Sequence, residues 1–299
     1  MNIVIAGGSG FIGKKLSQFL LNEGHTVFIL TRGESKEEND LIFVKWLQNG
    51  AKPELHLPNI DAFVNLAGVS LNDGRWTEKQ KELILRSRVE ATEEAQRIIE
   101  ALPHKPKVFI NSSAVGIYPV STTSMYSETS TEQADDFLGT VVNVWEDKAS
   151  NIAKLGIRTC YTRLGVVLGN SEGALPMMVL PYKLFAGGTI GSGEQWLSWI
   201  HVEDVCRAIR YLMEDETIEG PVNLTSPNPK RMRTFGKIIG DVLNKPHWLP
   251  VPSIVLQLAL GEKSMLVLEG QHVLPEKLLN SNFKFKYVSL SDALLNLLT

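Results

Sequence analysis

Apolar residues near the start of the chain form short continuous runs that alternate with helically spaced sets. Residues Asn2–Ala6 form such a run and predict a buried strand. The apolar residues between Phe11 and Glu23 recur with helical spacing, and Gly24 is placed to end that helix in a left-handed conformation. A second apolar run at His25–Arg32 completes a strand–helix–strand unit.

The same alternation continues along the chain. It predicts strands at residues 41–46, 61–66, 107–111 and 157–163 and helices at residues 77–101, with Thr77 as N-cap, and 136–155. Residues 33–40 and 114–135 show no period and predict loops. Strands that alternate with helices at this pace indicate an α/β fold with a doubly wound parallel sheet.

The pattern changes after residue 168. A glycine-rich stretch at residues 169–193 surrounds one apolar helix, residues 221–224 predict a short strand, and the chain beyond Thr234 is mostly helical with proline breaks. We therefore expect one domain of residues 1–168 with short returning segments near 197–224, and a smaller, discontinuous C-terminal lobe of residues 169–196 and 225–299.

Composition narrows the class of protein. The chain has 299 residues, 43% of them hydrophobic and 21% charged, and its net charge is −3. These values suit a globular protein and do not favour nucleic-acid or membrane partners. Cys160 and Cys206 lie in apolar contexts and are expected to be buried thiols, and no metal-ligand spacing is present. The initiator Met runs directly into the first strand, so we expect a cytoplasmic protein without a signal peptide.

The first candidate site is the turn after the first strand. Gly7, Gly10 and Gly13 form a GxxGxxG pattern that follows a strand and opens a helix. Glycines there let the backbone approach a pyrophosphate, and the amides of the helix N-terminus attract its charge. The turn therefore predicts a dinucleotide site; the alternative is a turn that is merely tight.

Arg32 indicates which dinucleotide is bound. In NAD-binding units an acidic residue near the end of the second strand contacts the ribose hydroxyls, whereas an arginine there can pair with a 2′-phosphate. The second strand ends Leu30-Thr31-Arg32, and no carboxylate follows until Glu34. This favours NADP(H) as cofactor; the alternative is a solvated arginine in a loop.

Several segments together resemble a known family. They are residues 7–13 (GGSGFIG), 65–68 (NLAG), 111–116 (NSSAVG), 163–169 (RLGVVLG) and 199–205 (WIHVEDV), with 74–77 (GRWT), 87–89 (SRV), 195–199 (QWLSW) and 269–275 (EGQHVLP). The first five resemble extended short-chain dehydrogenase/reductases. The other four resemble one atypical group, the epimerase-like family related to NAD-dependent epimerases and dehydratases, sometimes described as cell-division inhibitors.

The resemblance implies a Rossmann-like domain that binds NADP(H) beside a substrate lobe. It assigns cofactor contacts to Gly7, Gly10, Phe11, Ile12, Gly13, Thr31, Arg32, Leu66, Ala67, Gly68, Ser112, Leu164 and Val166. It also implies that the long helices at residues 77–101 and 136–155 could pair two subunits as a homodimer. His201 and Asp204 are expected to steady the entry to a helix.

The usual Tyr-x-x-x-Lys pair of the superfamily does not carry over. One register places Leu138 and Val142 at its positions, and the other places Val144 and Lys148 there, so neither offers a phenol. The serine position after the fifth strand falls on Ala114, and the asparagine of the long helix falls on Arg88. Reduction of a carbonyl needs a proton donor within reach. The candidate donors, in order of preference, are Tyr118, Ser113 and Glu146; Tyr118 could equally be a packed aromatic.

A substrate pocket is expected where large aromatics lie beside polar donors in glycine-rich loops. The residues predicted to line it are Arg75, Trp76, Arg88, Gln195, Trp196 and Trp199. Tryptophans that pack the interface between the lobes would produce the same pattern. The sequence thus favours an NADP(H)-binding oxidoreductase or epimerase-like enzyme with a small-molecule substrate; the alternative is a non-catalytic NADP(H) sensor or regulator.

Overall fold

An eight-stranded sheet forms the centre of the computed structural model, which describes residues 1–299. Its strand order is β12-β8-β6-β5-β1-β2-β4-β3. The strands are β1 (Asn2–Ala6), β2 (Thr26–Thr31), β3 (Lys36–Glu38), β4 (Leu41–Lys45), β5 (Ala62–Asn65), β6 (Val108–Ala114), β8 (Arg158–Leu164) and β12 (Gly220–Leu224). All neighbours pair in parallel except β3 and β4, which confirms the predicted doubly wound sheet.

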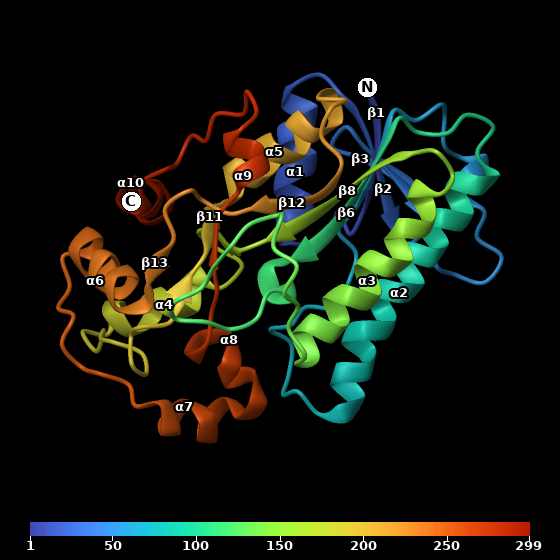
Figure 1. The fold of residues 1–299 in the computed structure, drawn as a ribbon. Helices are drawn as coiled ribbons and strands as arrows, with labels where there is room; N and C mark the ends of the chain where they lie inside the picture. The colour runs from blue at the N-terminus through green and yellow to red at the C-terminus, as the bar shows by residue number, and fades with distance from the viewer.

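Two helical layers cover the sheet (Figure 1). Helices α1 (Phe11–Asn22) and α5 (Val202–Glu214) bury their apolar residues against one face, and α2 (Glu78–Ala101) and α3 (Phe137–Ala153) against the other. Alternation along β1 feeds both layers, because Ile3 and Ile5 lie in the first core and Val4 in the second.

Local chemistry sets where the two long helices begin. The Thr77 hydroxyl accepts the amide of Gln80 at 3.3 Å, which confirms the predicted N-cap of α2. The Asp136 carboxylate accepts the amide of Gly139 at 2.8 Å and caps α3 in the same way. Each bond satisfies one amide that the helix itself leaves unpaired.

The sequence predicted a loop at residues 33–40, but part of this segment is a strand, β3. β3 forms an antiparallel hairpin with β4 at the edge of the sheet, and all three of its residues, Lys36–Glu38, are exposed. An exposed edge strand needs no apolar side chains, so hydrophobic periodicity cannot detect it. The predicted loop at 114–135 likewise contains a two-residue strand, β7 (Met125–Tyr126), which pairs with β14 (His272–Val273).

Short strand pairs outside the eight-stranded sheet occur in the C-terminal part of the chain. β9 (Val166–Leu168) pairs with β11 (Trp199–His201), and β10 (Trp196–Leu197) pairs with β13 (Lys230–Arg231). Helices α4 (Leu175–Lys183), α6 (Met232–Leu243) and α10 (Leu290–Leu298) share a separate core around Trp199. The remaining helices are α7 (Ser253–Leu260), α8 (Met265–Leu268) and α9 (Glu276–Leu279).

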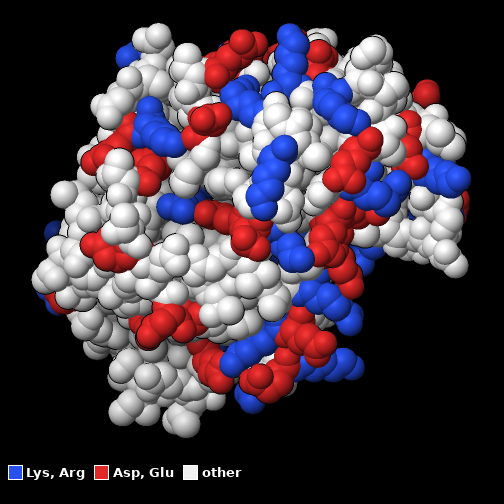
Figure 2. Space-filling model, turned by 45° about the vertical axis from the view of Figure 1, so that its right-hand side comes forward, with Lys and Arg blue, Asp and Glu red and all other residues white.

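The distribution of surface charge and the burial of the two cysteines agree with what the composition predicted. Figure 2 shows Lys and Arg interspersed with Asp and Glu over one face, without an extended patch of either sign. Cys160 and Cys206 are buried free thiols, as predicted, and burial raises their pKa to about 11 and about 12. No helix combines the length and the apolarity needed to cross a membrane.

Candidate functional site

The glycine turn between β1 and α1 is packed against the rest of the site. Gly7 has a φ of 81°, and a Cβ there would lie 2.7 Å from the carbonyl of Leu66. A Cβ at Gly13 would lie 2.3 Å from the Gly7 carbonyl oxygen. Both positions therefore need glycine for close approach of backbone to backbone, one to the end of β5 and one within the turn.

Gly10 is different, because nothing in the protein requires glycine at this position. Its φ of −78° suits any residue, and a Cβ would meet only the Gly7 oxygen, at 3.4 Å. Helix α1, which it precedes, has no side-chain cap and no acidic residue in its first turn. The helix thus presents free amides and open space, an arrangement that fits the diphosphate of a dinucleotide.

Phe11 and Ile12, both predicted cofactor contacts, are partly engaged by the protein. The Phe11 ring packs on the loop after β9, where a Cβ at Gly169 would lie 2.3 Å from it and one at Gly173 would lie 3.0 Å from it. Ile12 packs against the core beneath α1. Their backbone amides, rather than their side chains, remain the groups suited to bind the cofactor.

The residues at the end of β2 are those predicted to contact the 2′-phosphate of NADP(H). The Thr31 hydroxyl accepts the amide of Gly33 at 3.1 Å and shapes the turn. Arg32 is exposed and forms no ion pair, whereas Glu34 pairs with Lys45 at 2.7 Å. The carboxylate nearest in sequence is therefore occupied, and the guanidinium is free to bind an anion.

A buried amide network orders the end of β5, and no local sequence pattern indicates it. Asn65 donates to Asn111 at 2.8 Å and to Thr92 at 3.1 Å, and its carbonyl oxygen accepts the amide of Ala67 at 3.2 Å. These bonds hold the backbone of Leu66, Ala67 and Gly68 where the glycine turn contacts it. Side-chain pairing between strands 46 residues apart has no local signal.

The three predicted proton donors lie in one network, and its central residue is one that sequence reasoning missed. Arg163, near the end of β8, binds Glu146 through two bonds of 2.9 and 2.8 Å and donates to the Tyr118 hydroxyl at 2.9 Å. Ser113 donates to Glu146 at 2.5 Å. Burial opposes the charge of Arg163, but its bonds to Glu146 and Tyr118 hold its pKa above the usual range.

Tyr118, the first-ranked donor, is a packed aromatic in this structure. Its side chain is 1% exposed, stacks on Tyr126 at 5.3 Å and donates its hydroxyl to Asn223 at 2.9 Å. Burial raises its pKa, although Arg163 and Asn223 oppose that shift. Both contacts of the Tyr118 hydroxyl are made by protein groups, Asn223 and Arg163, so in this structure Tyr118 takes the packed-aromatic alternative.

The other two donors differ in access. Ser113 is 2% exposed, and the Glu146 side chain is 13% exposed. Val142, at the usual lysine position, packs in the same apolar cluster as Tyr118, and Leu138, at the usual tyrosine position, packs beside the Trp76 cluster. The positions that normally handle protons are therefore filled by apolar packing.

Burial contradicts the prediction for three of the six pocket residues, and a fourth, Trp196, is half-buried beside other side chains. Trp199 is fully buried in the lobe core, and Trp76 is 7% exposed with its indole bonded to the Leu71 carbonyl. Gln195 is 4% exposed and bonds two backbone carbonyls. The Trp196 ring stacks on His272, at 4.0 Å, and the Arg231 guanidinium lies over it, at 4.0 Å, so protein side chains already occupy this ring.

The remaining predicted residues keep free groups near the ends of the strands. Arg75 is exposed, and Arg88 lies beside Gly68 without a carboxylate partner. The Ser112 hydroxyl has no protein partner among the hydrogen bonds of the structure. Leu164 and Val166 are half-buried on either side of Gly165, where a Cβ would lie 2.4 Å from the Ser198 carbonyl oxygen.

His201 has the structural role expected from the sequence. Its Nδ1 accepts the amide of Glu203 at 3.1 Å as the N-cap of α5, and its Nε2 lies 3.2 Å from Asn296. Burial lowers its pKa to about 4. The Asp204 carboxylate accepts the amides of Lys286 and Tyr287 and ties the C-terminal segment to the same helix.

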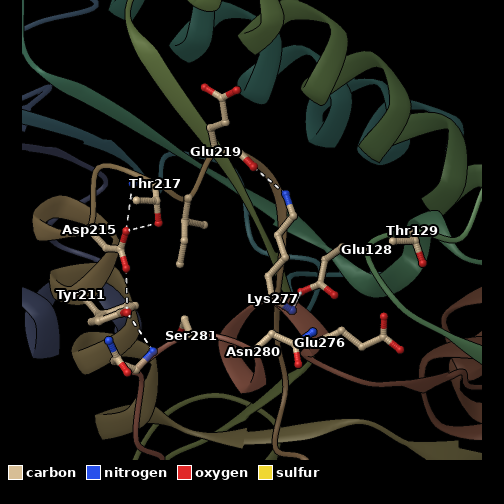
Figure 3. A pocket seen from close by; sticks show the side chains of 12 residues that line it. Glu128, Thr129, Tyr211, Asp215, Thr217, Glu219, Glu276, Lys277, Asn280 and Ser281 are labelled. Carbon is tan, nitrogen blue, oxygen red and sulfur yellow. Dashed lines mark hydrogen bonds between the residues drawn. The ribbon is translucent and has the colours of Figure 1, made fainter.

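A hollow of about 560 Å³ lies away from this site, at the amino end of the edge strand β12 (Figure 3). Its charged residues are Glu128, Asp215, Glu219, Glu276 and Lys277. Glu128 accepts the amide of Asn223 at 2.9 Å and so covers an unpaired donor of the edge strand. The excess of carboxylates makes this hollow unsuitable for a phosphate-bearing cofactor.

Two family models match the chain. Residues 3–224 match the NAD dependent epimerase/dehydratase family, and residues 251–297 match a domain of unknown function, DUF1731. The first model covers the sheet and its helices as far as the end of β12. The second covers the segment from α7 to α10.

Relatives and solved structures match over the full length. Epimerase family protein YfhF of Bacillus subtilis is 50% identical over 100% of this chain and 98% of its own length. The structure of human epimerase family protein SDR39U1 with NADPH has a TM-score of 0.88 at 32% identity and covers 99% of both chains. UDP-glucuronic acid 4-epimerase of Bacillus cereus, with NAD, has a TM-score of 0.78 at 16% identity over 99% of this chain and 96% of its own, a likeness of fold alone.

Proposed function

The chain belongs to the NAD dependent epimerase/dehydratase family, and from this premise we propose that it is an NADP(H)-dependent, epimerase-like oxidoreductase. Its substrate is a small molecule, and its proton chemistry does not use a tyrosine–lysine pair. The observation that carries the choice of cofactor is the free guanidinium of Arg32 at the end of β2, beside a Glu34 that Lys45 occupies. The NADPH bound by human SDR39U1, 32% identical, supports the same choice.

Different segments of the chain bind different parts of the cofactor. The amides at the start of α1 hold the diphosphate, with Gly10 leaving the space for it. Arg32 pairs with the 2′-phosphate, and the backbone at Leu66–Gly68 borders the cofactor at the end of β5. Bound NADPH supplies a hydride from its nicotinamide ring.

Reduction of a carbonyl also consumes one proton. In this chain the proton donor must be a group other than a tyrosine hydroxyl. Ser113 holds a proton on Oγ, hydrogen-bonded to Glu146 Oε1 at 2.5 Å, at the carboxyl end of β6. We assign proton delivery to Ser113, which gives its Oγ proton to the developing alkoxide and recovers one that Glu146 takes up from solvent, with Arg163 holding the Glu146 carboxylate in place through two hydrogen bonds. The partial exposure of Glu146 gives the pair its contact with solvent.

A second candidate function is a non-catalytic NADP(H) sensor. The burial of Tyr118 and Ser113 and the apolar residues Leu138 and Val142 favour it, because a binding protein needs no proton donor. The two functions share the cofactor site and differ in turnover. Oxidation of bound NADPH in the presence of carbonyl compounds, lost in Ser113→Ala at unchanged NADPH affinity, would support the enzyme; no oxidation with any compound would favour the sensor.

The choice of cofactor is tested by titration. Wild-type protein should bind NADPH about tenfold to a hundredfold more tightly than NADH, because a charge-assisted contact is worth about 1.5–3 kcal/mol. Arg32→Ala should remove most of that preference while leaving NADH affinity near its original value. Calorimetry with both cofactors measures it, and equal affinities in the wild-type protein would contradict the proposal.

A further inference from the structure

Arg88 in the middle of α2 is held rigidly at the end of β5. Its Nη1 donates to the carbonyl oxygens of Val69, at 3.1 Å, and Ile84, at 2.9 Å. Its guanidinium carbon lies 5.0 Å from the centre of the Trp145 ring. The position of that ring is itself set by a bond of 3.1 Å from its indole nitrogen to Thr92. One side of the guanidinium is therefore fully used for anchoring.

The other edge of this guanidinium has no partner in the protein. The five N–H groups of an arginine include three on Nε and Nη2, and for Arg88 none of these three has an acceptor. Neither nitrogen is sealed from solvent. No carboxylate lies within the 4.0 Å that defines the ion pairs of this structure, whereas Arg163 pairs with Glu146.

Arg158 shows that the absence of a carboxylate alone does not distinguish Arg88. Arg158 is also half-buried without an ion pair, but both of its terminal nitrogens donate to carbonyl oxygens, of Leu212 and Ile218 at 2.9 Å each. In Arg88, by contrast, Nε and Nη2, which together could bind an anion in a bidentate manner, have no acceptor. Burial lowers the pKa of Arg88 to about 10, which reflects a charge without compensation. Leaving such a charge uncompensated is unfavourable unless a ligand supplies the counter-charge.

The surroundings of Arg88 belong to the proposed cofactor cleft. A Cβ at Gly68 would lie 3.2 Å from Arg88 Cγ and Cζ, so glycine makes room for the guanidinium. Two residues earlier, Leu66 touches the glycine turn at Gly7. We propose that Arg88 binds an anionic group, a phosphate or a carboxylate, through its Nε and Nη2. This rests on the proposed function, because the anion is either the diphosphate of the dinucleotide or an acidic group of the substrate.

The first experiment measures NADPH affinity in Arg88→Met, which keeps the packing of the side-chain stem and removes the edge. A diphosphate contact predicts affinity about tenfold to a hundredfold lower. Arg86→Met removes an exposed arginine two residues away and controls for general charge. Ser87→Ala removes the hydroxyl that accepts the Val69 amide at 3.0 Å and controls for loosening of that loop. Both controls should bind NADPH normally.

If Arg88→Met binds NADPH as the wild type does, a second experiment tests the substrate. The NADPH complex is titrated with inorganic phosphate and with acetate while the fluorescence of the cofactor is followed. A saturable response in the wild type that Arg88→Met loses assigns the anion to the substrate. A wild type that binds NADPH, with Arg88→Met unchanged in both experiments, overturns this inference alone. A wild type that binds neither cofactor overturns the proposed function instead.

Discussion

At the residue scale, the glycines of the first turn have two different reasons to be glycine. Gly13 is required by the protein, because a side chain there would collide with the backbone of Gly7 and Gly8. Gly10 has no such requirement, and the space around it remains for a ligand. The same distinction applies to arginines. Arg163 is satisfied within the protein, whereas Arg32 and Arg88 keep donors free.

This distinction predicts that a substitution at Gly10 mainly lowers NADPH affinity, whereas one at Gly13 mainly lowers the stability of the protein. Gly10→Val should lower NADPH affinity by about tenfold or more, because the branched side chain fills the space for the diphosphate, and should cost about 1 kcal/mol of stability as a poorer N-cap. Gly13→Ala should cost about 1–3 kcal/mol, because a Cβ only 2.3 Å from the Gly7 oxygen forces the backbone to shift. Urea unfolding and NADPH titration of both variants measure these effects; unchanged affinity in Gly10→Val would contradict the assignment of the turn.

At the scale of elements, helix α5 depends on an imidazole at its N-cap. His201 accepts the Glu203 amide on Nδ1, so its proton resides on Nε2, facing the Asn296 oxygen. Tyr287 stacks on the ring at 3.8 Å. Protonation of Nδ1 would break the cap. The burial that lowers the pKa of His201 is opposed by Glu203 and Asn296 and reinforced by Lys286.

The cap makes the stability of the protein depend on pH. The unfolded imidazole takes up a proton as the pH falls through its ordinary pKa of 6.5, and the folded one only near 4, so stability is lost across that window. By linkage about 2 kcal/mol of the loss between about pH 7.5 and pH 5 belongs to His201. His201→Asn keeps an acceptor at the N-cap without a titrating ring and should remove that part of the loss. Urea unfolding at both pH values measures it, and the same pH dependence in variant and wild type would contradict the prediction.

At the scale of the whole molecule, the segment from α7 to α8 is fastened to the loop before α2. Lys263 donates to the carbonyl oxygens of Asn72 and Gly74, and Glu262 pairs with Lys81. Helix α7 itself buries no residue. Polar contacts between residues about 190 apart in the chain therefore contribute to holding this segment beside the carboxyl ends of the strands.

Removing these contacts should loosen the segment without unfolding the sheet. In a Glu262→Gln, Lys263→Met double variant, amide hydrogen exchange of residues 253–268 should accelerate by about twofold to fivefold, since surface pairs are worth about 0.2–1 kcal/mol. Salt near 1 M should produce part of this effect in the wild type. Lys14→Met, which removes the Lys14–Glu172 pair between α1 and the loop after β9, serves as control and should leave residues 253–268 unchanged. No acceleration in the double variant would contradict the role of these contacts.

The sequence by itself determined the parallel sheet, its two long helices and the glycine turn. Each of these has a local signal: apolar runs for buried strands, helical spacing for α2 and α3, cap residues such as Thr77, and a fixed spacing of glycines. Arg32 could be placed for the same reason, because the end of a predicted strand defines its position. The edge strand β3 was not predicted, because its exposed residues show no apolar period.

Only the tertiary structure decided which polar and aromatic residues pair. The sequence left Tyr118 open between a proton donor and a packed ring, and left the tryptophans open between a pocket and an interface. Tyr118 is bonded to Asn223, 105 residues away, and Trp196 stacks on side chains from two other segments. Arg163 and Glu146 lie on different elements, and nothing local links them. The period of a segment records which face is buried, whereas the partner of a buried polar group depends on how distant segments meet.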